Sequence, residues 1–138
     1  VLPYNLDAWD GYPVDREIMY NTFGTKKIIS FAGDTHNAWS SKLTKQDKTE
    51  IGIELATSGI TSPGFELYLG NNPSAETLKA FEGALTTLID DLNYFDASRR
   101  GYILTTFTNS NVKAEWVFVS SILSSSYSTS IRHTVVYS

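Results

Sequence analysis

The stretch KKIISFAGDTH, residues 26–36, joins a short apolar run to a polar end. Its central part, IISFA, lacks the regular alternation of polar and apolar residues that marks a half-exposed strand, so it predicts a strand buried on both faces. This strand is expected to end at Gly33, with Asp34 and His36 just beyond its carboxyl end. Because ligands of α/β proteins gather outside the carboxyl ends of strands, these two residues are the first candidates for a functional site.

Local signals on either side of this stretch predict a helix, a loop and a second strand. Pro13 suits the first turn of a helix and Gly24 ends one, so we expect a helix between them. Residues 40–49, SSKLTKQDKT, are polar and predict a loop or a frayed turn. Residues 51–55 alternate Ile and Leu with small or polar partners, which predicts a half-exposed strand. Gly, Ser, Thr and Pro crowd residues 57–64, which predicts an irregular loop.

The second half of the chain predicts one helix and three strands. Apolar residues recur with helical spacing over residues 74–92, so a helix is expected there. Two β-rich runs, residues 101–107 and 112–119, flank the turn-forming sequence TNSN and predict a hairpin. Residues 130–138 predict a final strand. The sequence therefore predicts a single domain over residues 1–138, of mixed α/β class, with more strands than helices.

Composition excludes several classes of protein. The formal net charge is −4, with 11 Lys and Arg residues that form no basic stripe, so nucleic acid is not an expected partner. No window approaches the roughly 18 to 20 consecutive apolar residues of a membrane span, and no signal sequence is recognisable at the start. The chain has no cysteine, so any metal must be held by oxygen and nitrogen ligands. A start without Met is expected of a processed product, a trimmed chain or a fragment.

The motif GDTH has two interpretations. Residues i and i+2 of an extended segment point to the same side, so Asp34 and His36 could present a carboxylate oxygen and an imidazole nitrogen to one ion. Gly33 would allow the backbone to come close to such a ligand. The alternative is a turn in which Asp34 caps a local N–H group. The motif taken alone leaves both interpretations open.

Other polar residues near the predicted strand ends also have a functional and a structural interpretation. Asp10 and Tyr12, in WDGY, could orient a metal-bound histidine or bind substrate; alternatively, Asp10 lies in a turn while Trp9 and Tyr12 lie in the core. Asn37 could reach phosphate or metal, or close a turn. His133 falls in a predicted strand, where a satisfied or solvated histidine is the expected role rather than a ligand.

The loop residues and one arginine pair complete the candidates. Ser58, Thr61 and Ser62 could donate hydrogen bonds into a cleft, but a nucleophilic serine is not expected without a base. Arg99 and Arg100 carry planar donors that suit phosphate. We expect a structural role for this pair at the start of a strand.

Five segments follow one another along the chain: LDAWDGYP (6–13), GDTHNAW (33–39), ATSGITSPG (56–64), RRGY (99–102) and KAEWVFV (113–119). As an ordered set they resemble the C-terminal part of the PhoD-like alkaline phosphatases. The resemblance implies a metallophosphoesterase, in which two mixed β-sheets form a sandwich flanked by helices and a multinuclear metal centre hydrolyses phosphate mono- and diesters. It further implies that Asp34 and His36 are metal ligands, with Ca and Fe as the expected ions and Mn or Zn as alternatives, and that the enzyme works in the periplasm or outside the cell.

The sequence also departs from that family. Its metal centre needs acidic and Asn-His motifs from the N-terminal half, whereas this chain has no Asn-His dipeptide and only two histidines. We therefore expect residues 1–138 to be the C-terminal region of a longer enzyme, inactive alone, with the N-terminal part and a phosphate ester as partners. Apolar surface left uncovered would favour self-association.

A different class of function uses the aromatic residues instead. Trp9, Trp39 and Trp116 could form stacking platforms of a non-catalytic carbohydrate-binding module, and an oligomerisation module is a further alternative. Trp116 alternates with Ala114 and Phe118, however, which is the spacing of a core-facing strand. The platform interpretation also leaves Asp34 and His36 without a role.

Overall fold

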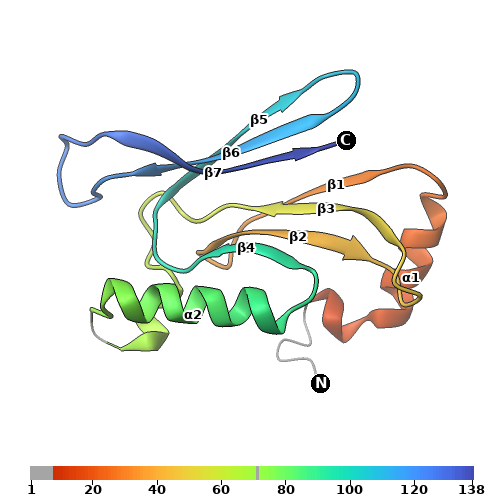
Figure 1. Cartoon of the computed structure of the whole chain (residues 1–138), viewed down its shortest axis with the longest axis horizontal. Coiled ribbons are helices and arrows are strands. Elements are labelled where there is room, and N and C mark those ends of the chain that lie inside the picture. The colour runs from red at the N-terminus through yellow and green to blue at the C-terminus, as the bar shows by residue number, and fades with distance from the viewer. Residues whose placement is uncertain (1–7, 71) are drawn as a thin grey trace.

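Two β-sheets form the frame of a computed structural model that describes residues 8–70 and 72–138 (Figure 1). This confirms the predicted mixed α/β class and partial sandwich. One sheet has four strands in the order β1-β3-β2-β4, and the other has three in the order β5-β6-β7. The strands are β1 (Ile28–Ala32), β2 (Ala38–Thr44), β3 (Glu50–Ala56), β4 (Leu92–Asp96), β5 (Gly101–Phe107), β6 (Val112–Val119) and β7 (Thr129–Tyr137).

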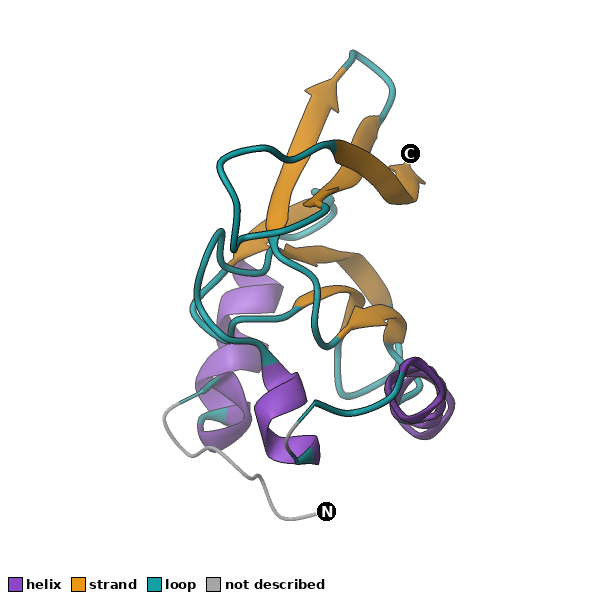
Figure 2. Cartoon of the chain, turned by 90° about the vertical axis from the view of Figure 1, so that its left-hand side faces the viewer, coloured by secondary structure: helices purple, strands orange, loops and turns teal. Residues whose placement is uncertain are grey.

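The helices lie on the opposite side of the four-stranded sheet from the three-stranded sheet, as the two views show (Figures 1 and 2). The α-helices are α1 (Pro13–Thr22) and α2 (Ala75–Leu88), and two short 3₁₀ helices are η1 (Trp9–Gly11) and η2 (Phe65–Leu69). Pro13 occupies the first turn of α1 as predicted. Within the described residues, no helix is long and apolar enough to cross a membrane.

The burial predicted for β1 and β3 is wrong, because β1 lies at the side of the sheet and β3 in its interior. β1 is an edge strand, with Phe31 about half exposed, whereas β3 pairs with β1 on one side and β2 on the other. β3 is therefore the strand that is buried on both faces. Gly52 allows this close pairing. A Cβ added at this position would contact the backbone carbonyl of Ile28 and would lie 2.9 Å from the Cβ of Ile28.

The loop predicted over residues 40–49 is also wrong in its first half. Residues Ala38–Thr44 form β2, which pairs antiparallel with β3 and with β4. Ser40 is fully buried on the core side of this strand. Polar side chains in β2 suggested a loop, but backbone pairing on both sides overrides their low strand preference.

The helix predicted over residues 74–92 ends early. Ser74 caps α2 by accepting a hydrogen bond from the Thr77 backbone N–H at 3.1 Å, and the helix ends at Leu88. Leu92, predicted on the helical stripe, begins β4 instead. The helical spacing of apolar residues continues to Leu92, past the end of the helix, but pairing of β4 with β2 places Leu92 in a strand.

The hairpin and the final strand are confirmed. β5 and β6 pair antiparallel from Gly101 with Phe118 to Phe107 with Val112, and the Thr108 N–H closes the turn on the Asn111 carbonyl at 2.9 Å. β7 pairs antiparallel with β6. The three strands therefore form a continuous meander.

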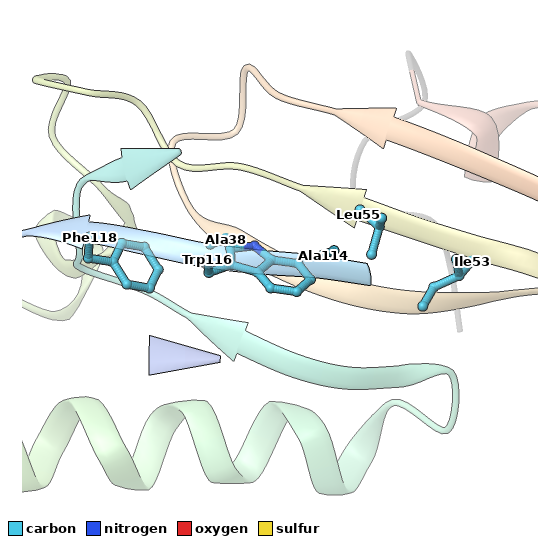
Figure 3. Packing of buried hydrophobic residues seen from close by; sticks show 6 residues of the cluster. All are labelled: Ala38, Ile53, Leu55, Ala114, Trp116 and Phe118. Atoms are coloured by element: carbon cyan, nitrogen blue, oxygen red, sulfur yellow. The ribbon is translucent and has the colours of Figure 1, made fainter. Parts of the chain in front are cut away.

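The core lies between the two sheets (Figure 3). Trp116 is fully buried there, as predicted, and packs with five other buried residues from both sheets: Ala38, Ile53, Leu55, Ala114 and Phe118. Its indole Nε1 donates a hydrogen bond of 2.9 Å to the carbonyl of Ala56, at the end of β3. This bond ties the three-stranded sheet to the end of the four-stranded one.

Candidate functional site

Four strands have an end on the same side of the four-stranded sheet, and we call this row of strand ends the site edge. The parallel strands β1 and β3 both end there, at Ala32 and Ala56, while the antiparallel β2 begins there at Ala38. β4 ends at the same edge, with Asp96 opposite Ala38. The segments 33–37, 57–64 and 97–100 therefore share this edge, which is where the sequence predicted a site.

Asp34 and His36 lie in a tight turn at this edge. Both residues are exposed, and both have left-handed backbone angles, with φ of 70° at Asp34 and 60° at His36. The expectation that they point to one side because the segment is extended is therefore wrong. Non-glycine residues in such conformations cost about 1–3 kcal/mol each, persist only where their surroundings hold them, and cluster at functional sites.

Two contacts within the turn help to hold it. The Thr35 N–H donates to the Gly33 carbonyl at 2.9 Å, and the Thr35 hydroxyl donates to the side-chain oxygen of Asn37 at 3.0 Å. Asn37 is only 5% exposed. These contacts are those of an asparagine that closes a turn, which was the structural alternative for this candidate.

Asp96 is a buried carboxylate at the same edge that the sequence did not single out. It is 1% exposed, accepts hydrogen bonds from the backbone N–H groups of Ser98 and Arg99 at 3.1 and 2.8 Å, and forms an ion pair with the Arg99 guanidinium. The Tyr94 hydroxyl also donates to it, at 3.4 Å. Burial, followed by the Asp96 charge, raises the pKa of Tyr94 well above its usual range.

The arginine pair has the structural role that was predicted. Arg99 is held by Asp96, and Arg100 forms an ion pair with Glu66 and donates to the Ser98 carbonyl. Each guanidinium is thus engaged by a carboxylate of the fold, while the Arg99 side chain stays half exposed and Arg100 Nε has no partner among the described residues. Among the loop serines, Ser58 is buried and its hydroxyl has no partner within the described part of the chain.

The residues of WDGY lie beside the edge rather than against His36. Asp10 lies in η1 and forms an ion pair with Arg16 at 3.1 Å. Tyr12 and Trp9 are each about half exposed, so the alternative that placed them in the core is wrong. Asp10 and Thr35 do line one cavity of about 540 Å³ between the helices and the sheet.

His133 lies on β7, partly buried against two aromatic side chains. Its ring stacks on Tyr94 at 3.9 Å between centroids and contacts Trp116, and burial lowers its pKa. Its Nε2 is buried without a partner among the described residues, whereas the residue as a whole is only partly buried. Burial of Trp116 also rules out a stacking platform built from all three tryptophans.

The donor set at the edge fits part of a metal site. Asp34 offers carboxylate oxygen and His36 offers imidazole nitrogen, a pair that suits hard or borderline cations. Over residues 8–70 and 72–138, no three His, Cys, Asp or Glu side chains gather closely enough to hold an ion. Asp34 and His36 would therefore need further ligands from other residues.

Comparison with known proteins gives consistent matches. The model of the family described as PhoD-like phosphatase matches residues 1–116. Alkaline phosphatase D of Bacillus subtilis (strain 168) is 28% identical over 141 residues, which cover 97% of this chain and 22% of that protein. A solved structure titled "Structure of PhoD" is 27% identical, with a TM-score of 0.76 over 97% of this chain and 25% of the other. The chain thus spans about a quarter of the length of these relatives.

Proposed function

Because this chain belongs to the PhoD-like phosphatase family, we propose that it is the C-terminal region of a metal-dependent phosphatase or phosphodiesterase and that Asp34 and His36 supply two metal ligands. The observation that carries this proposal is the GDTH turn. Its two candidate ligands are exposed and conformationally strained, and they lie where strand ends converge. Buried contacts at the same edge could maintain such a strained pair for function.

The side chains of this region have defined roles in the proposed site. The Asp34 carboxylate and the neutral His36 imidazole would each bind an ion, and Asn37 would keep the turn closed through Thr35. Asp10 and Tyr12 are proposed to contact the substrate or a ligand from the neighbouring η1 segment. When bound, the metal ions would polarise the phosphoryl oxygens and lower the pKa of a water.

The metals and their remaining ligands are proposed from the family relation. We propose Ca and Fe, with Mn or Zn as alternatives, because the chain offers oxygen and nitrogen donors and no thiolate. The chain covers only 22% and 25% of the matched relatives, and its candidate pair is incomplete as a metal site. The other ligands would therefore come from an N-terminal part of the same enzyme, and residues 1–138 would form a single domain that is inactive alone.

The cellular setting and the assembly are also part of the proposal. We propose an enzyme of the periplasm or the extracellular space that acts on phosphate esters, as the family resemblance implies. Large apolar side chains such as Phe31, Leu104 and Phe107 are exposed at the outer strands. The N-terminal part, or self-association in its absence, would cover this surface.

The test is hydrolysis of a chromogenic phosphate monoester and diester by the protein at its natural length. Asp34→Asn should lower the rate by about 100-fold or more, since a ligand to a catalytic ion is lost. Asp90→Asn is the matched control, because Asp90 is an exposed aspartate after α2. Circular dichroism would confirm that each variant is folded.

The opposite result has a clear meaning. If Asp34→Asn and Asp90→Asn hydrolyse both esters at the wild-type rate, GDTH is only a turn and the proposed ligand role is wrong. If the wild-type protein hydrolyses neither ester with any of the proposed metals, the proposed activity is wrong.

A further inference from the structure

A partly buried ion pair joins Glu66 and Arg100, two residues that are distant in the sequence. The side chains of Arg100 and Glu66 are 14% and 17% exposed, and their charged groups are in direct contact. Arg100 directly precedes β5, while Glu66 lies in η2. The pair therefore links the start of the three-stranded sheet to a loop at the site edge.

Glu66 holds this loop at three points. Its Oε1 accepts the Gly64 N–H at 3.2 Å as well as the Arg100 guanidinium, and its own N–H donates to the Ala97 carbonyl at 3.3 Å. The opposite side of the pair is fixed too, since Arg100 also donates to the Ser98 carbonyl. These bonds fix Gly64 against the edge.

Gly64 in turn packs directly against the GDTH turn. A Cβ added at Gly64 would lie 3.0 Å from the carbonyl oxygen of His36 and 2.6 Å from that of Ala97, and would contact the Glu66 carboxylate. Gly64 has an extended conformation that other residues can adopt. The glycine is therefore required by close packing against Ala97, Glu66 and His36, not by its backbone angles.

We propose that the Glu66–Arg100 pair, acting through Gly64, is a positioning element that maintains the strained backbone of His36. The contacts run from Arg100 to Glu66, from Glu66 to Gly64, and from Gly64 to the His36 carbonyl. The consequence for metal binding rests on the proposed function. The consequence for the order of the turn does not, because it follows from the packing alone.

A purely structural role for the pair makes a different prediction. In that case, loss of the pair would lower global stability and leave the turn as well ordered as before. A positioning role requires a local effect on residues 34–37 while the rest of the fold persists. Local opening of this kind is measured by amide hydrogen exchange.

The experiment compares Glu66→Gln with Glu50→Gln in the protein at its natural length. Glu50 is the matched control, because it pairs with Lys42 at 3.3 Å on an exposed surface at the other end of β3. Hydrogen exchange of a peptide covering residues 33–38 is followed by mass spectrometry without metal, and Mn²⁺ affinity is measured by calorimetry. Gly64→Ala disturbs the packing without changing charge, because its Cβ would crowd the Ala97 and His36 carbonyl oxygens, and Arg100→Lys serves if Glu66→Gln does not fold.

We expect exchange in the turn to rise about 10-fold in Glu66→Gln and Gly64→Ala, and Mn²⁺ affinity to fall about 10-fold or more, as for other residues that orient metal ligands. Glu50→Gln should change neither. Exchange in the turn equal to that of Glu50→Gln would overturn the proposal. Asp34→Asn, titrated in parallel, separates the two ideas. If it binds Mn²⁺ normally, the proposed ligand role fails, while the exchange result still decides the positioning role.

Discussion

Replacing Trp116 with Phe tests what joins the two sheets. Trp116 is fully buried and its indole N–H donates to the Ala56 carbonyl at 2.9 Å. Ala56 is the last residue of β3, directly before the loop at the site edge. The same bond therefore secures both the sandwich and the position of that edge.

The expected loss follows from the two changes that Phe makes. Taking away the buried donor of the Ala56 carbonyl costs about 1–3 kcal/mol, and the smaller ring leaves unfilled space among Ala38, Leu55 and Phe118 that costs about 1 kcal/mol more. Trp116→Phe should therefore lower the free energy of unfolding by about 2–4 kcal/mol.

The measurement is urea denaturation followed by far-ultraviolet circular dichroism, because tryptophan fluorescence itself changes in the variant. An unchanged denaturant slope would show that the midpoint shift reports stability. Trp9→Phe is the control, since Trp9 is about half exposed and should change stability by no more than about 0.5 kcal/mol. If Trp116→Phe costs no more than Trp9→Phe, the indole bond does not hold the sheets together.

Two further predictions concern His133 and the glycines. Burial lowers the pKa of His133 below the usual value near 6.5. The unfolded chain therefore binds more protons at this residue, and the free energy of unfolding should fall as pH drops from about 7 to 5. His133→Phe, which can still stack on Tyr94, should show a smaller fall when urea denaturation is measured at each pH, and a fall equal to that of the wild type would contradict the prediction. Gly101→Ala should destabilise the fold by about 1–3 kcal/mol, because its Cβ would contact the Val117 carbonyl. Gly83→Ala, in open space on α2, should stabilise it by about 0.5–1 kcal/mol, and thermal midpoints that shift equally in both variants would refute this distinction.

Local signals in the sequence were sufficient for several elements. Pro13 indicated the start of α1, TNSN indicated the turn between β5 and β6, and the alternation around Trp116 indicated a core-facing strand. Each of these signals depends on backbone preference or on side-chain alternation within a few residues. The ordered motifs also indicated the family, which the match over residues 1–116 confirms.

Burial of the individual strands required the strand order. An apolar run such as that of β1 is compatible with a central or an edge position, and only pairing of β3 with both β1 and β2 decides which strand is central. In the same way, pairing made a strand of the polar β2 and ended the apolar periodicity of α2 before Leu92. Hydrogen bonds between segments far apart in the sequence outweigh such local preferences.

The sequence by itself determined the mixed fold class, the hairpin and the position of GDTH after a strand. Tertiary structure alone decided that Asp34 and His36 have left-handed backbones and that Asp96 is buried at the same edge. It also decided that Gly64 lies against the His36 carbonyl. The physical reason is that motifs reflect interactions along a few residues, whereas a strained turn is maintained by packing of segments that the chain brings together only when it folds.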